Sequence, residues 1–339
     1  MRRKMVLGVV LACVVFAAGA NAGELDIDNA PPPPENEQAI RDAVARGLDY
    51  LAKSQNKDGS WGTGSYSRDV AVTGLAAMAL MSQGNVGNRG KYGKNVTDGI
   101  EFILRNVNQH SGFIGNGPSS RMYHHGFATL ALAEALGMDH SELLEDRLRK
   151  AVRLIIRSQK PDGGWRYDPS PTGMSDLSVT VCQVMALRAA RNAGVKVPKE
   201  VIDRAVEYVK KSANEDGSFR YMLNQASGKS YALTGAGVTT LFGAGEYDTP
   251  EIEAGLDYLM RGAGGNFGHY YYGQYYAAQA MYFAGGDMFR EWYAKVSKEL
   301  LARQQQDGSW SGEINEAYAT AMSCLVLQIH NCYLPIFQK

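Results

Sequence analysis

The sequence predicts an all-α protein, an (α/α)6 toroid in which six outer helices surround six inner helices in one domain. A short turn with a glycine and an aromatic residue recurs six times, which indicates six copies of one structural unit. In each unit the helix before the turn is amphipathic, whereas the helix after it is apolar on nearly every side. A helix without a polar face must be buried by its neighbours on every side. This favours a closed ring over an open solenoid or separate two-helix repeats.

The start of the chain predicts export. Basic residues at positions 2–4 precede an apolar run over residues 5–18, and small residues follow up to Ala22, as in a signal peptide over residues 1–22. The run is shorter than the ~20 residues that cross a bilayer, which argues against an uncleaved anchor. Lipidation at Cys13 is a further alternative. We therefore expect cleavage near Ala22 and a periplasmic or secreted protein.

A Pro-rich linker over residues 23–35 precedes the toroid, which we place at residues 36–339. The chain has 35 basic and 35 acidic residues without a block of like charge, so we expect no nucleic-acid partner. The sequence does not indicate a protein partner. After signal cleavage three cysteines remain, and we expect buried free thiols at Cys182, Cys324 and Cys332.

The recurring turn predicts architecture rather than chemistry. Its aromatic residues lie 43 to 54 positions apart, at Trp61, Phe113, Trp165, Phe219, Phe267 and Trp310. Three copies have the full pattern Gln-x-x-x-Gly-x-Trp, with the glutamines at Gln55, Gln159 and Gln304. A glycine suits a left-handed residue where a helix stops. The glutamine amide can bond backbone groups at helix ends, and the indole can cover it from water.

The first unit shows the two helix types. Val44, Leu48 and Leu51 form an apolar stripe at helical spacing, which predicts an outer helix with one solvent-exposed face. Residues 70–81 have no polar stripe, which predicts an inner helix. Further on, Thr249 before Pro250 predicts the start of the fifth outer helix, and a capping box of Asp139 with Glu142 predicts the start of the third.

The Gln-x-x-x-Gly-x-Trp repeats, from about residue 38 to about residue 333, resemble those of the squalene-hopene cyclase and oxidosqualene cyclase family. That family shares a helical toroid with the β subunits of protein prenyltransferases. The resemblance implies a toroid with a central cavity for an apolar isoprenoid. It does not by itself imply a reaction.

Aligned inner helices place candidate site residues on one face. A threonine recurs at Thr73, Thr129, Thr180, Thr234 and Thr320, with Tyr276 in the fifth unit. One helical turn earlier, on the same face, come Asp69, His125, Asp176, Ser230, Tyr272 and Glu316. If the ring closes, Glu316 lies beside Asp69, and these two with His125 and Asp176 are the candidate catalytic residues. Helix capping is the alternative role for the carboxylates.

We expect Ser178, Thr180, Ser230, Tyr272 and Tyr276 to line the cavity, where aromatic faces can stabilise a cation. His124 should instead be a packing or capping residue, because consecutive helical residues point about 100° apart.

The family resemblance implies a specific acid, the central aspartate of an Asp-x-Asp-Asp-Thr run. The matching residues here run from Asp176 to Thr180, with Ser178 in the place of the donor and Val179 after it. A serine hydroxyl is too weak an acid to protonate an alkene, which argues against squalene cyclisation by this mechanism.

The related prenyltransferases hold zinc through an Asp-x-Cys pair and a histidine, and the thiolate is absent from Asp176-x-Ser178. His125 with Asp69 and Asp176 could form a nitrogen and oxygen site for zinc, but no spaced ligand motif supports one. We expect no cofactor.

Three functions remain open. The first is an exported terpenoid cyclase or prenyltransferase-like protein that binds an apolar isoprenoid, with Asp176, Asp69 or Glu316 as acid. The second is a non-catalytic binding or interaction module on the same fold. The third is a carbohydrate-active barrel that uses two of the carboxylates.

Overall fold

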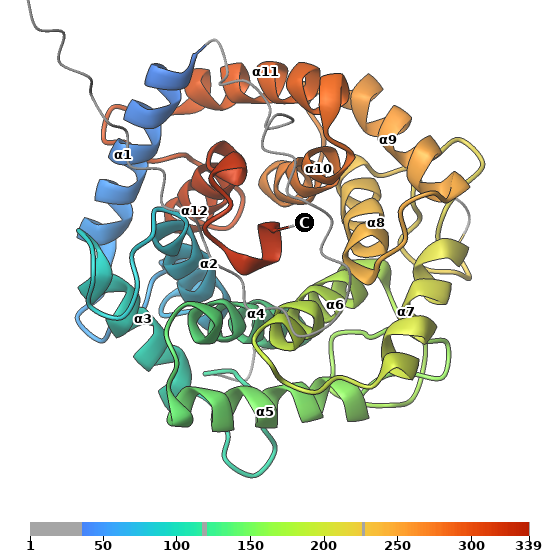
Figure 1. Cartoon of the computed structure of the whole chain (residues 1–339), viewed down its shortest axis with the longest axis horizontal. Helices are drawn as coiled ribbons and strands as arrows, with labels where there is room; N and C mark the ends of the chain where they lie inside the picture. Colours follow the sequence, from blue (N-terminus) through green and yellow to red (C-terminus); the bar gives the residue numbers. More distant parts are fainter. Residues whose placement is uncertain (1–35, 117–120, 226–227, 339) are drawn as a thin grey trace, which may run out of the picture. The chain divides into compact units, whose positions relative to one another are not determined.

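The computed structural model describes residues 36–116, 121–225 and 228–338. The predicted signal peptide, the predicted linker and Cys13 lie outside these residues. The unit from Pro34 to Lys339 has two concentric layers of helices (Figure 1). Its outer helices are α1 (Glu37–Ser54), α3 (Gly93–Arg105), α5 (Glu142–Arg157), α7 (Lys199–Lys211), α9 (Pro250–Gly262) and α11 (Gly286–Arg303). Its inner helices are α2 (Val70–Met81), α4 (Met122–Met138), α6 (Leu177–Asn192), α8 (Tyr231–Ala244), α10 (Tyr270–Ala284) and α12 (Glu316–Leu327). The predicted fold class is confirmed.

The ring closes between the last and the first unit. Helix α12 packs against α2 and α1, and Gln304 Nε2 donates a hydrogen bond of 2.8 Å to the carbonyl of Ala43. At the other end of the same seam, Gln83 Nε2 donates to Gln328 Oε1 at 2.7 Å. These contacts join residues more than 240 positions apart, so the array is a ring and not an open solenoid.

The glutamine of each full turn connects two neighbouring units. Gln159 Nε2 donates to the carbonyl of Gly163 in its own turn at 2.7 Å and to that of Val201 in the next outer helix at 2.8 Å. Gln55 and Gln304 make the same pair of bonds, at 2.8 to 2.9 Å. Each indole N–H donates to a carbonyl ten positions earlier, as Trp165 does to Ile155 at 2.7 Å. The motif therefore satisfies backbone groups at helix ends.

Glycine is required in these turns for two reasons. Gly163 has φ of 99°, in the left-handed region that favours glycine. A Cβ there would also lie 2.2 Å from the carbonyl oxygen of Arg204, on the next outer helix. The turn therefore needs both the conformation and the small size of glycine.

The helix boundaries show where the sequence-based predictions of helix starts succeed and where they fail. Helix α2 spans Val70–Met81 as predicted. The capping box of Asp139 with Glu142 is wrong, because the Oγ of Ser141 caps α5 by accepting from the N–H of Leu144 at 3.5 Å. Thr249 is the N-cap of α9, but its hydroxyl makes no capping hydrogen bond.

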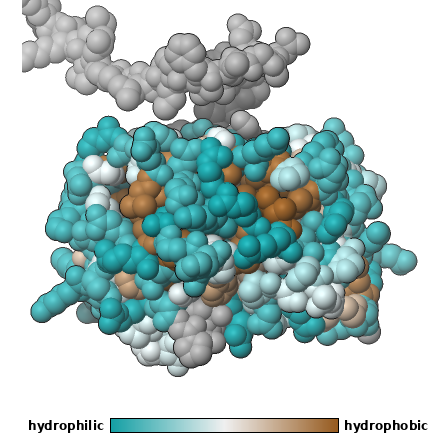
Figure 2. Space-filling model, turned by 90° about the horizontal axis from the view of Figure 1, so that it is seen from below, coloured by the Kyte–Doolittle hydropathy of each residue, from teal (hydrophilic) through white to brown (hydrophobic). Residues whose placement is uncertain are grey.

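The outer wall is polar and the interior apolar. Figure 2 views the wall on the side of α5, where hydrophilic residues predominate and apolar ones show mainly in hollows. The three described cysteines are free thiols, as expected, with Cys182 and Cys324 buried and Cys332 half-buried. Across the described residues, no helix is both long enough and apolar enough to span a bilayer.

The chain ends inside the ring, near its axis (Figure 1). Leu334, Ile336 and Phe337 are buried there, against the inner helices α4 and α6. The Ile336 N–H donates to Oε2 of the buried Glu134 at 3.1 Å. Burial raises the pKa of the Glu134 carboxyl to about 8. The C-terminal segment therefore packs on a carboxyl group that is costly to ionise.

Candidate functional site

A cavity of about 570 Å³ opens at the end of the ring where the inner helices begin. All six inner helices contribute to it, which places it on the axis of the toroid. The lining is mainly aromatic and aliphatic, and it consists of Tyr66, Asp69, Ala71, Val72, Leu75, Tyr123, His124, Phe127, Tyr167, Ser178, Tyr221, Ser230, Ala232, Leu233, His269, Tyr272, Ile314 and Tyr318. Its volume lies within the range of roughly 300–1,000 Å³ that is typical of small-molecule sites.

Asp69 is held at the cavity wall by the start of α2. Its backbone N–H donates to the carbonyl of Trp61 at 3.0 Å, which brings the end of the first turn next to the helix start. Its Oδ1 accepts from the N–H groups of Ala71 at 2.8 Å and Val72 at 3.0 Å. The aspartate thus caps the helix, the alternative role that the sequence left open, and its carboxylate also lines the cavity.

His124 fixes the other oxygen of this carboxylate. His124 Nε2 lies 3.0 Å from Asp69 Oδ2. The backbone N–H of Arg121 donates to His124 Nδ1 at 2.9 Å, so Nδ1 is an acceptor and the ring proton belongs on Nε2. Both ring nitrogens are therefore engaged. The carboxylate of Asp69 therefore accepts three hydrogen bonds, two from backbone N–H groups and one from the His124 ring.

Asp176 and Ser178 form a second polar cluster, after the Asp69–His124 pair, at the start of α6. Ser178 lines the cavity, whereas Asp176 is fully buried behind it. The Ser178 hydroxyl bonds Asp176 Oδ1 at 2.7 Å, and the N–H of Val179 donates to the same oxygen at 2.9 Å. The Tyr221 side chain is a further hydrogen-bond partner of the Asp176 carboxyl. Burial raises the pKa of Asp176, although the hydrogen bonds from Ser178 and Val179, the positive charge of Arg166 and the hydrogen bond with Tyr221 all oppose that shift.

Tyrosine hydroxyls surround the cluster of Asp176 and Ser178. Tyr272 donates to the carbonyl of Ser178 at 3.1 Å, and the hydroxyls of Tyr167 and Tyr221 lie 2.6 Å apart. Burial raises the pKa of Tyr123 and of Tyr272 far above the usual value for a phenol. These phenols are neutral hydrogen-bonding groups near pH 7, and their ring faces are apolar surface.

Two further polar residues lie on the side of α8 and α10. The Ser230 hydroxyl accepts from the N–H of Leu233 at 3.2 Å and so caps α8. His269 precedes α10 and is exposed, with Nδ1 3.1 Å from Oε2 of Glu313. Both residues line the cavity.

Of the two adjacent histidines, His124 and not His125 faces the cavity. His125 does not line the cavity, because its ring is fully buried between the two layers and stacks on Phe113. Its Nδ1 accepts from the N–H of Ile114 at 3.1 Å, and its Nε2 lies 3.2 Å from the carbonyl of Ala151. Burial lowers the pKa of His125 to about 4, so it is a neutral packing residue. His124, which sequence reasoning assigned to packing or capping, caps α4 by accepting from the Arg121 N–H, and it also faces the cavity.

The other expected site residues divide between the cavity and the packed layers. Ser178, Ser230 and Tyr272, which were expected at the cavity, line it, and so does Asp69, which was a candidate catalytic residue. Glu316 is exposed at the first position of α12 and does not line it, and Asn315 caps that helix instead. Thr180 and Tyr276 are fully buried outside the lining.

A metal site does not fit these residues. The zinc site considered from the sequence needs His125 beside Asp69 and Asp176, but the His125 ring faces Ile114 and Ala151. Nowhere in the described ranges do three or more His, Cys, Asp or Glu side chains come together in a way that could hold a metal ion.

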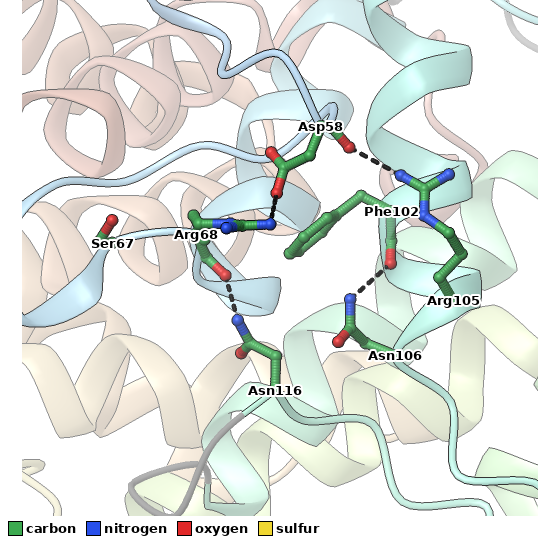
Figure 3. A pocket seen from close by; sticks show the side chains of 7 residues that line it. All are labelled: Asp58, Ser67, Arg68, Phe102, Arg105, Asn106 and Asn116. Atoms are coloured by element: carbon green, nitrogen blue, oxygen red, sulfur yellow. Dashed lines mark hydrogen bonds and ion pairs between the residues drawn. The ribbon is translucent and has the colours of Figure 1, made fainter.

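A second hollow, of about 420 Å³, lies outside the ring axis, between the first turn and α3 (Figure 3). Asp58 pairs with the guanidinium of Arg68, and Arg105 donates to the carbonyl of Asp58 at 2.7 Å. Asn116 donates to the carbonyl of Arg68, and Asn106 donates to that of Phe102. Because its polar groups bond one another, this hollow is a less suitable ligand site than the axial cavity.

Comparison with curated proteins finds terpenoid enzymes. A probable squalene–hopene cyclase of Sinorhizobium fredii is 23% identical over 197 residues, which cover 52% of this chain and 30% of the relative. A drimenyl diphosphate synthase of Streptomyces showdoensis is 27% identical over 191 residues, which cover 55% of this chain and 33% of that protein. The chain thus spans about a third of the length of these relatives.

Solved structures share the fold at low sequence identity. A variant of the type II terpene cyclase MstE from Scytonema, in complex with geranylgeranyl dihydroxybenzoate, has a TM-score of 0.64 and 13% identity, and the match covers 88% of this chain and 98% of that one. The cellobiose 2-epimerase of Spirochaeta thermophila has a TM-score of 0.67 and 12% identity, with 88% and 99% covered. One fold therefore accompanies two different chemistries.

A family model described as the prenyltransferase alpha-alpha toroid domain matches residues 74–266, which include the starts of the inner helices α4, α6 and α8. This match covers more than half of the chain, so the chain belongs to the prenyltransferase alpha-alpha toroid family.

Proposed function

We propose that this protein binds an uncharged apolar molecule of the isoprenoid class in the axial cavity. The observation that carries the proposal is the lining, where aromatic and aliphatic side chains from all six inner helices enclose about 570 Å³. Burying apolar surface releases about 25 cal/mol per Å², so such a cavity favours a long hydrocarbon over a polar metabolite. The MstE complex, in which a relative of the same fold holds a geranylgeranyl compound, supports this class of ligand.

The charges at the cavity favour a neutral ligand over a prenyl diphosphate. The described lining contains the carboxylate of Asp69 and neither lysine nor arginine. Proteins recognise phosphate groups with guanidinium, ammonium or free backbone N–H groups. A diphosphate in this cavity would face a carboxylate without a compensating cation, at a cost in binding free energy.

We further propose binding without cyclisation. A terpenoid cyclase of this family needs a carboxylic acid that reaches the alkene, and Ser178 takes that place here. Asp69 reaches the cavity, but its two oxygens already accept three hydrogen bonds, from two backbone N–H groups and from His124, so it is held as the cap of α2. Asp176 is separated from the cavity by Ser178.

A carbohydrate-active barrel is less well supported. The cellobiose 2-epimerase shows that this fold accommodates sugar chemistry in another protein. Hydrolysis with paired carboxylates needs two of them ~5–10 Å apart across the substrate. Among the described lining residues Asp69 is the one carboxylate, and Glu316 is exposed away from it.

The basic and apolar residues at the start of the chain support export, so the proposed ligand would be bound outside the cytoplasm. An exported binding toroid would hold a lipid-like molecule away from water, a role that needs a cavity but no acid.

The test is a binding titration with farnesol, an uncharged isoprenoid. Leu233→Trp adds a large ring to a half-buried position of the lining and should abolish binding. Leu143→Trp makes the same change on the exposed surface of α5, where the leucine is 54% exposed, and should leave binding unchanged. Equal affinity of both variants and the wild type would show that farnesol binds elsewhere and would overturn the proposal.

A further inference from the structure

The carboxylate of Asp69 is the one carboxylate among the described lining residues, and its hydrogen bonds are unevenly distributed over its two oxygens. Oδ1 accepts from the backbone N–H groups of Ala71 and Val72, at 2.8 and 3.0 Å, and so faces the start of α2. Oδ2 lies 3.0 Å from Nε2 of His124, on the next inner helix, α4. A carboxylate has about four lone-pair positions, so three of them are used and one remains, on Oδ2.

The remaining lone pair belongs to the oxygen that can meet a bound molecule. Asp69 and His124 both line the cavity, and their side chains are nearly buried, with 9% and 15% exposed. Because Oδ1 is turned to the helix start, Oδ2 is the oxygen left for the ligand. A ligand without a hydrogen-bond donor would cover this acceptor and leave it unpaired, which is unfavourable.

His124 fixes the position of Oδ2 from a second unit of the ring. Its Nδ1 accepts from the backbone N–H of Arg121 at 2.9 Å, so the ring proton is on Nε2, towards Asp69. The carboxylate is thus held from two sides, by the first N–H groups of α2 and by the imidazole of α4. An acceptor that is already ordered loses little conformational entropy when a ligand binds to it.

The other polar groups of the lining are weaker acceptors. The Ser230 hydroxyl already accepts from a backbone N–H, and the hydroxyls of Tyr167 and Tyr221 bond each other. These oxygens are uncharged, whereas a hydrogen bond to a carboxylate is roughly twice as strong as one between neutral groups. A donor on the ligand is therefore bound best at Asp69.

We propose that Asp69 Oδ2 accepts a hydrogen bond from a hydroxyl group of the ligand, so that the ligand is an isoprenoid-type alcohol or phenol. This inference rests on the proposed binding function and specifies it: the hydroxyl group lies at the starts of α2 and α4, and the hydrocarbon chain fills the rest of the cavity. A hydroxyl group supplies one donor, which matches the one lone pair that remains. An ether, ketone or ester oxygen would face the carboxylate as a second acceptor.

The experiment compares farnesol with farnesyl methyl ether, which has the same chain and the same oxygen but no donor, by displacement of a fluorescent apolar probe at pH 7. Without a partner for the hydroxyl group the ether should bind more tightly, because burying an unpaired hydroxyl is costly. We expect the wild type to bind the alcohol at least about tenfold more tightly than the ether. Equal affinities, or tighter binding of the ether, would overturn the inference, and this comparison needs no variant.

Asp69→Ser removes the carboxylate and keeps a side chain that can cap α2, as Ser230 caps α8 and Ser141 caps α5. The alcohol preference should disappear or reverse, and the ether should bind as before. A preference that persists would assign the alcohol to another acceptor and overturn the role of Asp69.

Asp307→Ser is the matched control. Asp307 also accepts from a backbone N–H, that of Ser309 at 3.0 Å, but it lies in the last turn and outside the cavity lining. This variant should retain the alcohol preference, and its loss there too would show that the preference does not depend on Asp69 in particular. Thermal unfolding verifies that both variants are folded.

The two proposals fail differently. If neither farnesol nor its methyl ether binds, the proposed function fails. If both bind and the wild type does not prefer the alcohol, the cavity takes apolar ligands and only the Asp69 inference is overturned.

Discussion

Gln304, in the last full turn, donates a hydrogen bond of 2.8 Å to the carbonyl of Ala43, in the first helix of the ring. The same side chain amide donates to Gly308 in its own turn at 2.9 Å, and its carbonyl accepts from Arg46. The recurring glutamine thus closes the seam between the two ends of the domain. It acts there as it does between Gln55 and Asn95 or between Gln159 and Val201.

Gln304→Leu should lower the free energy of unfolding by about 1–3 kcal/mol, because it leaves the carbonyls of Ala43 and Gly308 without their donor. The measurement is urea denaturation monitored by circular dichroism. Gln306→Leu is the matched control: it makes the same change at an exposed position two residues further on and should cost less than about 0.5 kcal/mol. Equal effects would contradict the role of Gln304 at the seam.

Gly163→Ala should be one of the more damaging small substitutions, at roughly 2–5 kcal/mol. It combines a left-handed φ of 99° with a Cβ placed 2.2 Å from the carbonyl oxygen of Arg204. Gly173→Ala separates the two causes. Gly173 has φ of 84° but no atom within 4 Å of the added Cβ, so it should cost only about 1–2 kcal/mol. The difference between their denaturation midpoints measures the contact between neighbouring units, and no difference would show that this contact is unimportant.

Glu134 should make the fold less stable as pH rises. Burial holds its pKa at about 8 in the folded state, against an ordinary value of 4.5. Below pH 4.5 both states are protonated and the stability is fully present. Between about pH 4.5 and 8 only the unfolded chain releases the proton, so stability falls by at most about 1.4 kcal/mol per pH unit, and above pH 8 the loss is complete.

Glu134→Gln keeps this position uncharged and should remove most of that pH dependence. The measurement is the free energy of unfolding from pH 5 to pH 8 for the wild type and the variant. Glu316→Gln, at an exposed glutamate, should retain the wild-type slope. A variant curve parallel to that of the wild type would show that Glu134 is ionised in the folded state.

Phe337→Ala should loosen the C-terminal segment from the ring. Phe337 is 1% exposed, and replacing a buried phenylalanine by alanine typically costs roughly 3–5 kcal/mol. If the segment opens locally, the Ile336 N–H, which donates to Glu134, should exchange with solvent at least about a hundredfold faster. Tyr333→Ala, at a position that is 53% exposed, should leave this exchange nearly unchanged. Unchanged exchange in Phe337→Ala would show that Phe337 does not hold the segment.

The sequence predicted the architecture because the repeats encode local backbone satisfaction. The spacing of Gln159, Gly163 and Trp165 is set by the bonds that these residues make, and it recurs wherever the same turn is built. Helix α2 was predicted to the residue, because a continuous apolar stretch begins after the capping Asp69. The closure of the ring was predicted because the inner helices lack a polar face.

The cavity face was predicted only in part, because the recurring threonine marks the wrong side of the helix. Thr180 Oγ1 accepts from the N–H of Trp165 at 2.9 Å, so this face points to the turn and not to the axis. His125 shares that face with Thr129 and turns to Ile114 in the same way. His124 is one residue earlier, about 100° around the helix, and faces the cavity.

Glu316 illustrates a second cause of error, a change of spacing. Thr320 follows its tryptophan by 10 positions, whereas Thr180 follows Trp165 by 15. With the shorter connection, the N-cap of α12 is Asn315, one residue earlier than the alignment assumed, and Glu316 is exposed in the first turn. The carboxyl behind Ser178 was named from the sequence, but its burial depends on packing against other units.

The most direct test of the central claim compares the affinities of farnesol and farnesyl diphosphate for the purified protein by isothermal titration calorimetry. They have the same hydrocarbon chain and differ in the charged end. An aromatic cavity with Asp69 and without lysine or arginine in its described lining predicts that farnesol binds and that the diphosphate binds at least about tenfold more weakly. Tighter binding of the diphosphate, or no binding of farnesol, would contradict a cavity built for an uncharged apolar ligand.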